Sequence, residues 1–483
     1  MRIFFLNPPY TRRVSRASRW PEVTKSGTFY YPFWLAYATG WAQKKGHQVF
    51  LFDAIAKMKN RKDTVEKIKE FNPNLIVMEV TTPTIHYDVR TVDYLKKAGV
   101  KARIVIVGSH PTALPEETLR MSKNIDFVAI TEYDLTVEKL VRNLDSPQKV
   151  RGIAYLKDEK YFQTPPHEPI TDLDSFPFVS KIYREFLDVN DYGYTLARHP
   201  MIQIFYARGC PNHCVFCNFP QTLTGRTYRK RSKENFIKEL EYIKEKMPEV
   251  KEIFIEDDTF AIIPKDAEET CEMMTEKKLN LTWSVNARVS LPLKTMQKMK
   301  KAGCRLLVVG YESGNDQILL NIKKGTTVEM QRQFAENARK AGLKVFGCFM
   351  LGLPGETKET MQETFKLAKE LKPDMVFFQQ AVPFPGTEFY DWAKAKGFMT
   401  TSDFRKWFNS SGQLDTIINY PKLSRREIEK TRDRFMKKFY SSPGYIWRTF
   451  VRNLNPRESI RVLKGFWAYL KYRLTRKETI KSS

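Results

Sequence analysis

Three cysteines stand close together in a turn-rich segment and could bind one metal centre. Cys210, Cys214 and Cys217 follow the spacing C-x3-C-x2-C, directly after the strand-like run Ile202-Gln-Ile-Phe-Tyr206. Three thiolates at this spacing favour an iron–sulfur cubane, because a cubane with three protein ligands leaves one of its four irons open to a substrate or cofactor. The segment therefore predicts a cluster with a vacant coordination position.

Two other interpretations stay open on these residues alone. His213, in the same loop, could complete a four-ligand zinc site. A disulfide is disfavoured, because the chain starts Met-Arg-Ile-Phe-Phe without an apolar signal segment, which predicts a cytosolic protein with reduced thiols. The remaining cysteines stand alone in helical or strand-like segments and are expected to be core residues: Cys271, Cys304 and Cys348.

Length and charge narrow the class of protein. The 483 residues, of which 42% are hydrophobic, predict two or three folded domains. The net charge of +26 favours an acidic partner such as anionic lipid, a phosphorylated substrate or nucleic acid, although a lysine-rich solvated surface would give the same composition. No run approaches the ~18 apolar residues of a membrane-spanning helix, so we expect any membrane contact to be peripheral.

Residues 1–145 alternate short apolar runs with helical patterns. Continuous apolar runs are typical of strands buried on both faces, so this part predicts a doubly wound, Rossmann-like parallel sheet. Ligands of such sheets bind at the carboxyl ends of the strands. The expected strands are 2–6, 47–52, 74–80, 103–107 and 126–130.

Residues 146–200 are expected to be a linker, with a hairpin at 152–156 and 160–162 followed by proline-rich connections. Residues 201–400 then repeat strand and helix, which predicts a partial (β/α)6 barrel of the TIM type with its chemistry at the carboxyl ends of the strands. Polar residues cluster at those ends. The expected strands are 202–206, 252–256, 281–285, 305–309, 344–350 and 374–378.

Residues 401–483 are expected to form a helical, basic extension. Between residues 445 and 477, nine arginines and lysines alternate with aromatic residues at a spacing that would separate them onto two faces of a helix. This pattern favours a helix that lies on an anionic membrane surface. A helix docked on the barrel and RNA binding through stacked aromatic residues remain alternatives, and nucleic acid is the less favoured partner.

The cysteine motif, with Phe216 before the third cysteine, resembles the signature of radical S-adenosylmethionine (SAM) enzymes. The resemblance implies a [4Fe-4S] cluster whose open iron binds SAM, and a reduced cluster that splits SAM into methionine and a 5′-deoxyadenosyl radical. Residues 1–145 resemble the cobalamin (B12)-binding domain that precedes some radical SAM domains. They lack its Asp-x-His-x-x-Gly loop, and neither His86 nor His110 stands in such a context, so the resemblance leaves open whether cobalamin binds without a histidine or has been lost.

The same resemblance implies roles for residues at the barrel rim. Asp257 or Asp258, with Glu256 as an additional candidate, would receive the ammonium of SAM, and Arg288 would bind its carboxylate. Phe216 would contribute backbone contacts to adenine. Further cofactor contacts are implied for Glu312, Ser313 and Gly352. An acidic residue at a strand end is also a common helix cap, so each assignment alone would be weak.

Several phrases, among them Asp257-Asp-Thr-Phe260 and Leu351-Gly-Leu-Pro-Gly-Glu-Thr357, resemble the radical SAM synthases of bacteriohopanetetrol cyclitol ether and calditol. This narrower resemblance implies ring contraction of a sugar on a glycosylated membrane lipid, by a protein on the inner face of the cell membrane that receives electrons from a ferredoxin or flavodoxin. A cobalamin-dependent methyltransferase or cyclase is the alternative function. Catalytic residues cannot be assigned, and the candidates for steering the substrate are Tyr311, Gln379 and Gln380.

Overall fold

Seven strands form the N-terminal sheet of the computed structural model, which describes residues 1–23 and 27–452. The strand order is β2-β1-β3-β4-β5-β6-β7, and β1 to β5 are parallel as predicted. The expected hairpin exists, but it joins this sheet as an antiparallel edge. The strands are β1 (Arg2–Asn7), β2 (Gln48–Asp53), β3 (Leu75–Glu79), β4 (Arg103–Val107), β5 (Phe127–Ala129), β6 (Ile153–Lys157) and β7 (Lys160–Gln163).

Alternate residues of these strands are buried on opposite faces of the sheet. Ile3 and Phe5 belong to a cluster with α1 (Phe33–Lys44) and α6 (Asp134–Val141). Phe4 and Leu6 belong to a second cluster with α2 (Arg61–Phe71) and α3 (Ile85–Lys97). Because both faces are covered, the strands can be apolar throughout, and the sheet is doubly wound. Two short helices, α4 (Ser109–Ala113) and α5 (Pro115–Arg120), follow β4.

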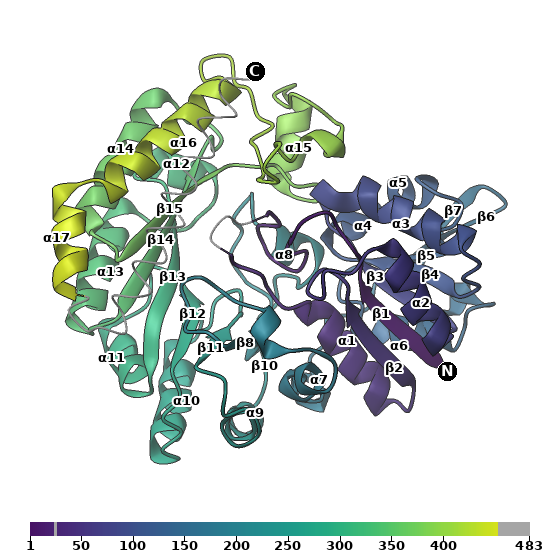
Figure 1. Ribbon diagram of the computed structural model, residues 1–483. Coiled ribbons are helices and arrows are strands. Elements are labelled where there is room, and N and C mark those ends of the chain that lie inside the picture. The colour runs from purple at the N-terminus through teal and green to yellow at the C-terminus, as the bar shows by residue number, and fades with distance from the viewer. Residues whose placement is uncertain (24–26, 453–483) are drawn as a thin grey trace.

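Six parallel strands form the second sheet, which curves into a partial barrel (Figure 1). Their order is β8-β11-β12-β13-β14-β15, so each strand lies next to its successor in this series, as expected of a TIM-like half-barrel. The short pair β9 (Ala207–Arg208) and β10 (Arg229–Lys230) lies apart. The strands are β8 (Met201–Ile204), β11 (Glu252–Ile255), β12 (Trp283–Ala287), β13 (Cys304–Glu312), β14 (Lys344–Leu351) and β15 (Met375–Gln380).

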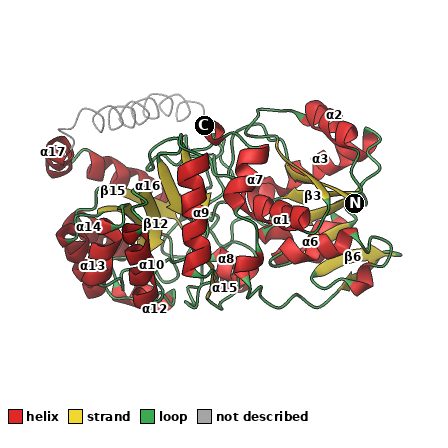
Figure 2. Ribbon diagram, turned by 90° about the horizontal axis from the view of Figure 1, so that it is seen from below, coloured by secondary structure: helices red, strands yellow, loops and turns green. Residues whose placement is uncertain are grey.

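Helices cover the outer face of this barrel (Figure 2). Several begin at a polar residue that caps the first turn, such as Ser232 before α9 and Thr357 before α14. The helices of this half are α8 (Asn218–Thr222), α9 (Lys233–Lys246), α10 (Pro264–Glu276), α11 (Leu293–Lys301), α12 (Asp316–Asn321), α13 (Val328–Lys340), α14 (Lys358–Leu371) and α15 (Glu388–Ala395). Between the two sheets the chain forms α7 (Val179–Phe186).

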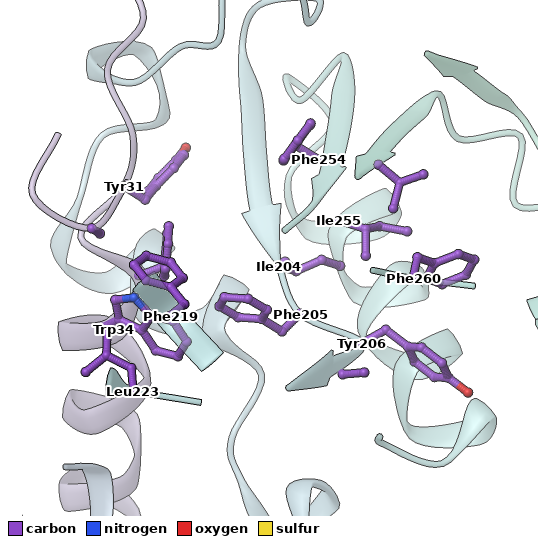
Figure 3. Packing of buried hydrophobic residues seen from close by; sticks show 14 of the residues in the cluster. Tyr31, Trp34, Ile204, Phe205, Tyr206, Phe219, Leu223, Phe254, Ile255 and Phe260 are labelled. Atoms are coloured by element: carbon purple, nitrogen blue, oxygen red, sulfur yellow. The ribbon is translucent and has the colours of Figure 1, made fainter. Parts of the chain in front are cut away.

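The two domains share one hydrophobic core. Trp34 of α1 packs against Phe205, which follows β8, and against Phe219 of α8, with ring centroids 5.1 and 5.7 Å apart (Figure 3). The hydroxyl of Tyr31 donates a hydrogen bond of 2.9 Å to the carbonyl of Met201. These contacts belong to a single cluster that runs from the N-terminal sheet through the barrel, so the position of each domain depends on the other.

The C-terminal extension is only partly helical. Residues 398–423 are mainly irregular, with isolated bridges and a short 3-10 helix, Phe404–Lys406. The expected charged helix is α16 (Arg425–Tyr440), capped by Ser424, and α17 (Pro443–Arg452) follows. Most of the predicted basic and aromatic helix at 445–477 lies outside the described residues. Within the described part of the chain, no helix combines the length and apolarity needed to cross a bilayer.

Candidate active site

The cysteine loop follows β8 and β9 at the carboxyl end of the barrel. Cys210 and Cys214 are buried, Cys217 is half-buried, and all three are free thiols. Gly209 has a φ of +85°, and a Cβ there would lie 2.1 Å from the carbonyl oxygen of Thr227, so only glycine fits this turn. His213 points to solvent rather than into the buried side of the loop.

Hydrogen bonds from other segments fix this loop. The side-chain amide of Gln221 donates to the carbonyls of Val215 and Cys217, at 3.2 and 2.8 Å. The backbone N–H of Val215 donates to Ile322 at 3.1 Å, which ties the loop to the far side of the barrel. Asn212 donates to the sulfur of Cys210 at 3.2 Å. Most of the hydrogen bonds that fix the loop go to its backbone, and among these contacts only that of Asn212 uses a cysteine sulfur.

Glu256 and Asp258 lie together beside this loop, and a residue of the N-terminal domain binds both. The guanidinium of Arg19 forms an ion pair with Glu256 and donates to Asp258 at 3.0 Å. The side-chain amide of Gln203 donates to the other carboxylate oxygen of Glu256 at 2.9 Å. The hydroxyl of Thr224 donates to the other carboxylate oxygen of Asp258 at 3.0 Å. Burial raises the pKa of Glu256, and the positive charge of Arg19 partly opposes this rise. Two of the expected SAM carboxylates are therefore brought together, but with a cation between them.

Asp257 occupies a different position from its neighbours. One of its carboxylate oxygens accepts hydrogen bonds from the backbone of Tyr206 and Ala207, at 2.8 and 3.0 Å. The side chain is fully buried, and burial raises its pKa to about 8. Asp257 thus supports the backbone just before the cysteine loop, which differs from the ammonium-binding role that the resemblance implied.

On the opposite side of the loop, Lys324 contacts both Glu312 and Arg288. Lys324 was not among the site residues predicted from the sequence. The ammonium of Lys324 lies 2.7 Å from Glu312. Arg288 donates to the carbonyl of Lys324 and lies 3.8 Å from the sulfur of Cys214. Burial lowers the pKa of Lys324, but the nearby Glu312 and Cys214 raise it by more than burial lowers it. The net pKa is therefore raised, and Lys324 stays charged. A Cβ at Gly310 would lie 2.2 Å from Glu312, so glycine makes room for this pair.

The other predicted contacts divide into near and remote residues. Phe216 is half-buried, and its ring lies 6.0 Å from the ammonium of Lys324. Ser313 is fully buried, and its hydroxyl lies 3.3 Å from Thr364 on α14. Gly352 donates to Glu356, and its carbonyl accepts from Tyr420 at 2.9 Å. Phe216 thus lies beside the site, whereas Ser313 contacts α14 and Gly352 is bound by Glu356 and Tyr420 of neighbouring loops.

The inner face of the barrel is partly open at its second half. In β15, and in β14 as far as Cys348, every second residue is half-buried and the residues between them are buried. The half-buried residues include Phe346, Cys348, Phe377 and Gln379. Of the steering candidates, Gln379 faces this side. Gln380 accepts from the backbone of Thr416 at 2.8 Å, and Tyr311 stacks on Phe349, so both belong to the core.

The carboxyl end of the N-terminal sheet carries buried polar atoms that lack partners among the described residues. They are Oε2 of Glu79, the hydroxyl of Tyr133 and Nε2 of His110. Burial raises the pKa of Glu79 to about 8 and lowers that of His110 to about 3, so both are neutral at pH 7. Unsatisfied buried groups cost free energy, and a polar ligand is one way to satisfy them.

This end of the sheet also contacts the cysteine region. Helix α4, which carries His110, packs against α8, which begins directly after Cys217. A Cβ at Gly386, in the loop after β15, would lie 2.8 Å from both Ala113 of α4 and Thr222 of α8. The carboxyl ends of the two sheets therefore meet at one place between the domains.

Each half of the chain matches a known protein family. Residues 204–368 match the radical SAM superfamily, and residues 20–141 match the B12 binding domain. An uncharacterized methyltransferase of Pyrococcus horikoshii is 30% identical over 94% of this chain and 98% of its own length. The anaerobic magnesium-protoporphyrin IX monomethyl ester cyclase of Rubrivivax gelatinosus is 27% identical over 96% of this chain and 82% of its own.

Solved structures share this fold at low sequence identity. The radical SAM methyltransferase TsrM of Kitasatospora setae, with cobalamin and a [4Fe-4S] cluster, has a TM-score of 0.71 at 15% identity over 92% of this chain and 89% of its own. The cobalamin-dependent radical SAM enzyme OxsB has a TM-score of 0.71 at 15% identity over 96% of this chain and 72% of its own. The chain thus belongs to the radical SAM superfamily, to its methyltransferases and cyclases with an N-terminal B12-binding domain.

Proposed function

We propose that the protein is a cobalamin-dependent radical SAM enzyme that modifies a hydrophobic substrate by methyl transfer or cyclisation. The observation that carries this proposal is the contact between α4 and α8. It joins the edge where a B12-binding domain would hold its corrinoid to the segment that would hold the cluster. A methyl carrier and a radical generator must reach the same substrate, and this contact supports such an arrangement.

Three free, buried or half-buried thiols on one loop offer ligands for a [4Fe-4S] cluster that would bind SAM. Cys210, Cys214 and Cys217 would each hold one iron and leave the fourth for SAM. When bound and reduced, the cluster supplies the electron that cleaves SAM. Around it, Glu256 and Asp258 offer carboxylates for the SAM ammonium.

The carboxyl end of the N-terminal sheet offers polar atoms to a ligand such as a corrinoid, which would have to displace the Phe404 ring that packs on His110 at 4.9 Å. The unpartnered atoms of Glu79, Tyr133 and His110 would gain hydrogen bonds there. A bound corrinoid would supply a methyl carrier. His110 donates or accepts at Thr82 through Nδ1, at 3.2 Å, and keeps Nε2 for the ligand. Because the chain lacks the Asp-x-His-x-x-Gly loop, no histidine of that loop would bind the cobalt.

The inner face of the barrel favours an apolar substrate. Phe346, Phe377 and Met375 are half-buried on this face, and Gln379 is its polar member in β15. Tyr30 and Tyr194, whose ring centroids are 5.8 Å apart, cover the part near β11, where Tyr194 contacts Phe254. Aromatic and aliphatic walls with few polar groups are typical of sites for hydrophobic ligands.

Ring contraction of a glycosylated lipid is the finer form of this proposal, and it stays a prediction. The apolar barrel face supports a lipid substrate. Peripheral binding to an anionic membrane is supported by α17, where Ile446 and Trp447 have exposed fractions of 56% and 66%. A ferredoxin or flavodoxin would supply the electron, as the family resemblance implies.

The test uses anaerobic protein reconstituted with iron, sulfide and hydroxocobalamin. After desalting, we expect a corrinoid absorbance. When the protein is then reduced in the presence of SAM, we expect 5′-deoxyadenosine to form. Lipid extracts incubated with SAM labelled at its methyl group separate the reactions: methyl transfer labels the product, whereas cyclisation or ring contraction does not. Protein that retains iron and cleaves SAM but never retains a corrinoid would contradict the cobalamin part of the proposal.

A further inference from the structure

One short segment of the N-terminal domain reaches both halves of the molecule. Arg16 is fully buried in its own domain, where it forms an ion pair with Asp88 at 2.5 Å and donates to Asn7 at 2.8 Å. Arg19, three residues later, extends into the barrel and binds Glu256 and Asp258. Arg16 thus anchors this segment to the N-terminal sheet, while the side chain of Arg19 binds groups of the barrel.

The contacts of Arg19 are those of a residue fixed in place. One of its NH2 groups donates to the backbone carbonyl of Glu256 and to Asp258, both at 3.0 Å, and the other binds the Glu256 carboxylate. Its guanidinium lies 5.0 Å from the ring centroid of Phe219, on the helix that follows Cys217. A planar guanidinium can bridge two carboxylates and a carbonyl in one geometry, whereas a lysine ammonium is a point charge.

The net charge of Arg19, Glu256 and Asp258 together is opposite to that of SAM. Two ionised carboxylates with exposed side-chain fractions of 2% and 5% would repel each other, and burial disfavours their charge. Arg19 cancels one charge and leaves a net charge of −1. SAM carries a sulfonium, an ammonium and a carboxylate, and so has a net charge of +1.

We propose that Arg19, in the N-terminal half of the chain just before the segment that matches the B12-binding domain, is a positioning residue for SAM in the radical SAM site. It holds Glu256 and Asp258 together where the SAM ammonium is received, and it sets the charge of that place. This inference rests on the proposed radical SAM function, and it deepens that function by making SAM binding depend on the N-terminal domain.

The experiment measures SAM affinity and the change that SAM causes in the electron paramagnetic resonance spectrum of the reduced cluster. Arg19→Gln is compared with wild type and with Arg13→Gln, which removes an exposed arginine of the same segment. We expect Arg19→Gln to weaken SAM binding by about tenfold or more, since it loses charge-assisted hydrogen bonds. Iron content should stay at the wild-type value, and Arg13→Gln should bind SAM like wild type.

Arg19→Lys tests the mechanism and covers the case in which Arg19→Gln fails to fold. Lysine restores the charge but not the fork, so we expect SAM affinity between those of wild type and Arg19→Gln. If Arg19→Lys, and Arg19→Gln where it folds, keep their iron and bind SAM within about twofold of wild type, the proposal is overturned. A wild-type protein that binds no SAM would instead contradict the proposed function, and corrinoid content does not enter this test.

Discussion

Arg208, on the strand that leads into the cysteine loop, donates a hydrogen bond of 2.9 Å to Asp134, the first residue of α6 in the other domain. Both side chains are almost completely buried. Glu132 lies 3.4 Å from Arg208 and 2.7 Å from Arg229, so it connects the two arginines. The rings of Trp34 and Tyr37 surround the Arg208 guanidinium, at 5.4 and 5.0 Å. The loop after β5 is thus linked by ion pairs to the two short strands beside the cysteines.

Replacing Arg208 by Met should destabilise the whole protein. The change leaves Asp134 buried without its partner, which typically costs about 3–5 kcal/mol. Thermal and urea unfolding of the two proteins measure the difference. Arg120→Gln is the matched control, because the Arg120–Glu116 pair is half-exposed and such pairs contribute at most about 1 kcal/mol. Equal losses from both variants would contradict a special role for the Arg208 pair.

Single replacement of Cys210, Cys214 or Cys217 by Ala should abolish cluster binding and SAM cleavage. Each thiol would hold a different iron, so none can substitute for another. Iron and sulfide analysis after reconstitution, together with assay of 5′-deoxyadenosine, checks this. Cys271→Ala and Cys304→Ala remove buried thiols of the barrel core and should keep the cluster. Loss of iron from either control would show that the ligands are assigned wrongly.

His110→Ala should weaken cobalamin retention about tenfold, because it removes a buried nitrogen that has no partner among the described residues and that we propose for the corrinoid. Absorbance after desalting, at equal iron content, measures the loss. His167 also has a buried, unpartnered Nε2 among the described residues, but it lies in the linker after β7. His167→Ala should therefore retain corrinoid like wild type, and a shared loss would point to a general effect on folding.

The carboxyl of Glu356 should make stability fall as pH rises from about 5 to 8. Burial raises its pKa from 4.5 to about 8, although the N–H groups of Leu353 and Gly352 oppose the shift. In this range the unfolded chain has lost the proton and the folded protein keeps it, so rising pH favours unfolding, by up to about 1.4 kcal/mol per pH unit.

Glu356→Gln removes this titration, so its unfolding free energy should depend less steeply on pH in the same range. Urea unfolding at several pH values measures the slopes. Glu359→Gln is the control, since Glu359 is exposed and its pKa is lowered, which places its titration below this range. If the slope for Glu356→Gln equals that of wild type, the raised pKa is wrong.

Membrane binding should depend on the exposed apolar residues of α17. Ile446→Ser combined with Trp447→Ser should reduce retention on anionic liposomes in a flotation assay, because both side chains could enter the interface. Leu320→Ser is the control, since Leu320 has an exposed fraction of 70% on a helix of the barrel. Unchanged flotation of the double variant would argue against this surface as the membrane contact.

The strands and the cysteine loop could be predicted because their signals are local. Continuous apolar runs marked β1 to β5, and the C-x3-C-x2-C spacing marked the loop that carries the three candidate ligands. The membership of the hairpin β6–β7 in the first sheet could not be predicted, because pairing of an edge strand leaves no periodic pattern.

The residues that complete the site have no such local signal. Arg19 meets its partner Glu256 across 237 positions of sequence, and an arginine among several in its segment carries no mark of that contact. Lys324 was missed because a lysine after a short helix is usually solvated, whereas here Glu312 lies within reach. Conversely, Asp257 had the expected residue type at the expected strand end, yet its side chain serves the backbone.

The continuous cluster of buried side chains that joins the two sheets has a consequence for how the gene can be divided. A fragment that began at the barrel would leave Phe205, Phe219 and Met201 without the α1 and Tyr31 surfaces that now cover them. Separately expressed halves should therefore aggregate unless they are produced together, and recombination between relatives should succeed at surface loops rather than at the nominal border between corrinoid and radical modules.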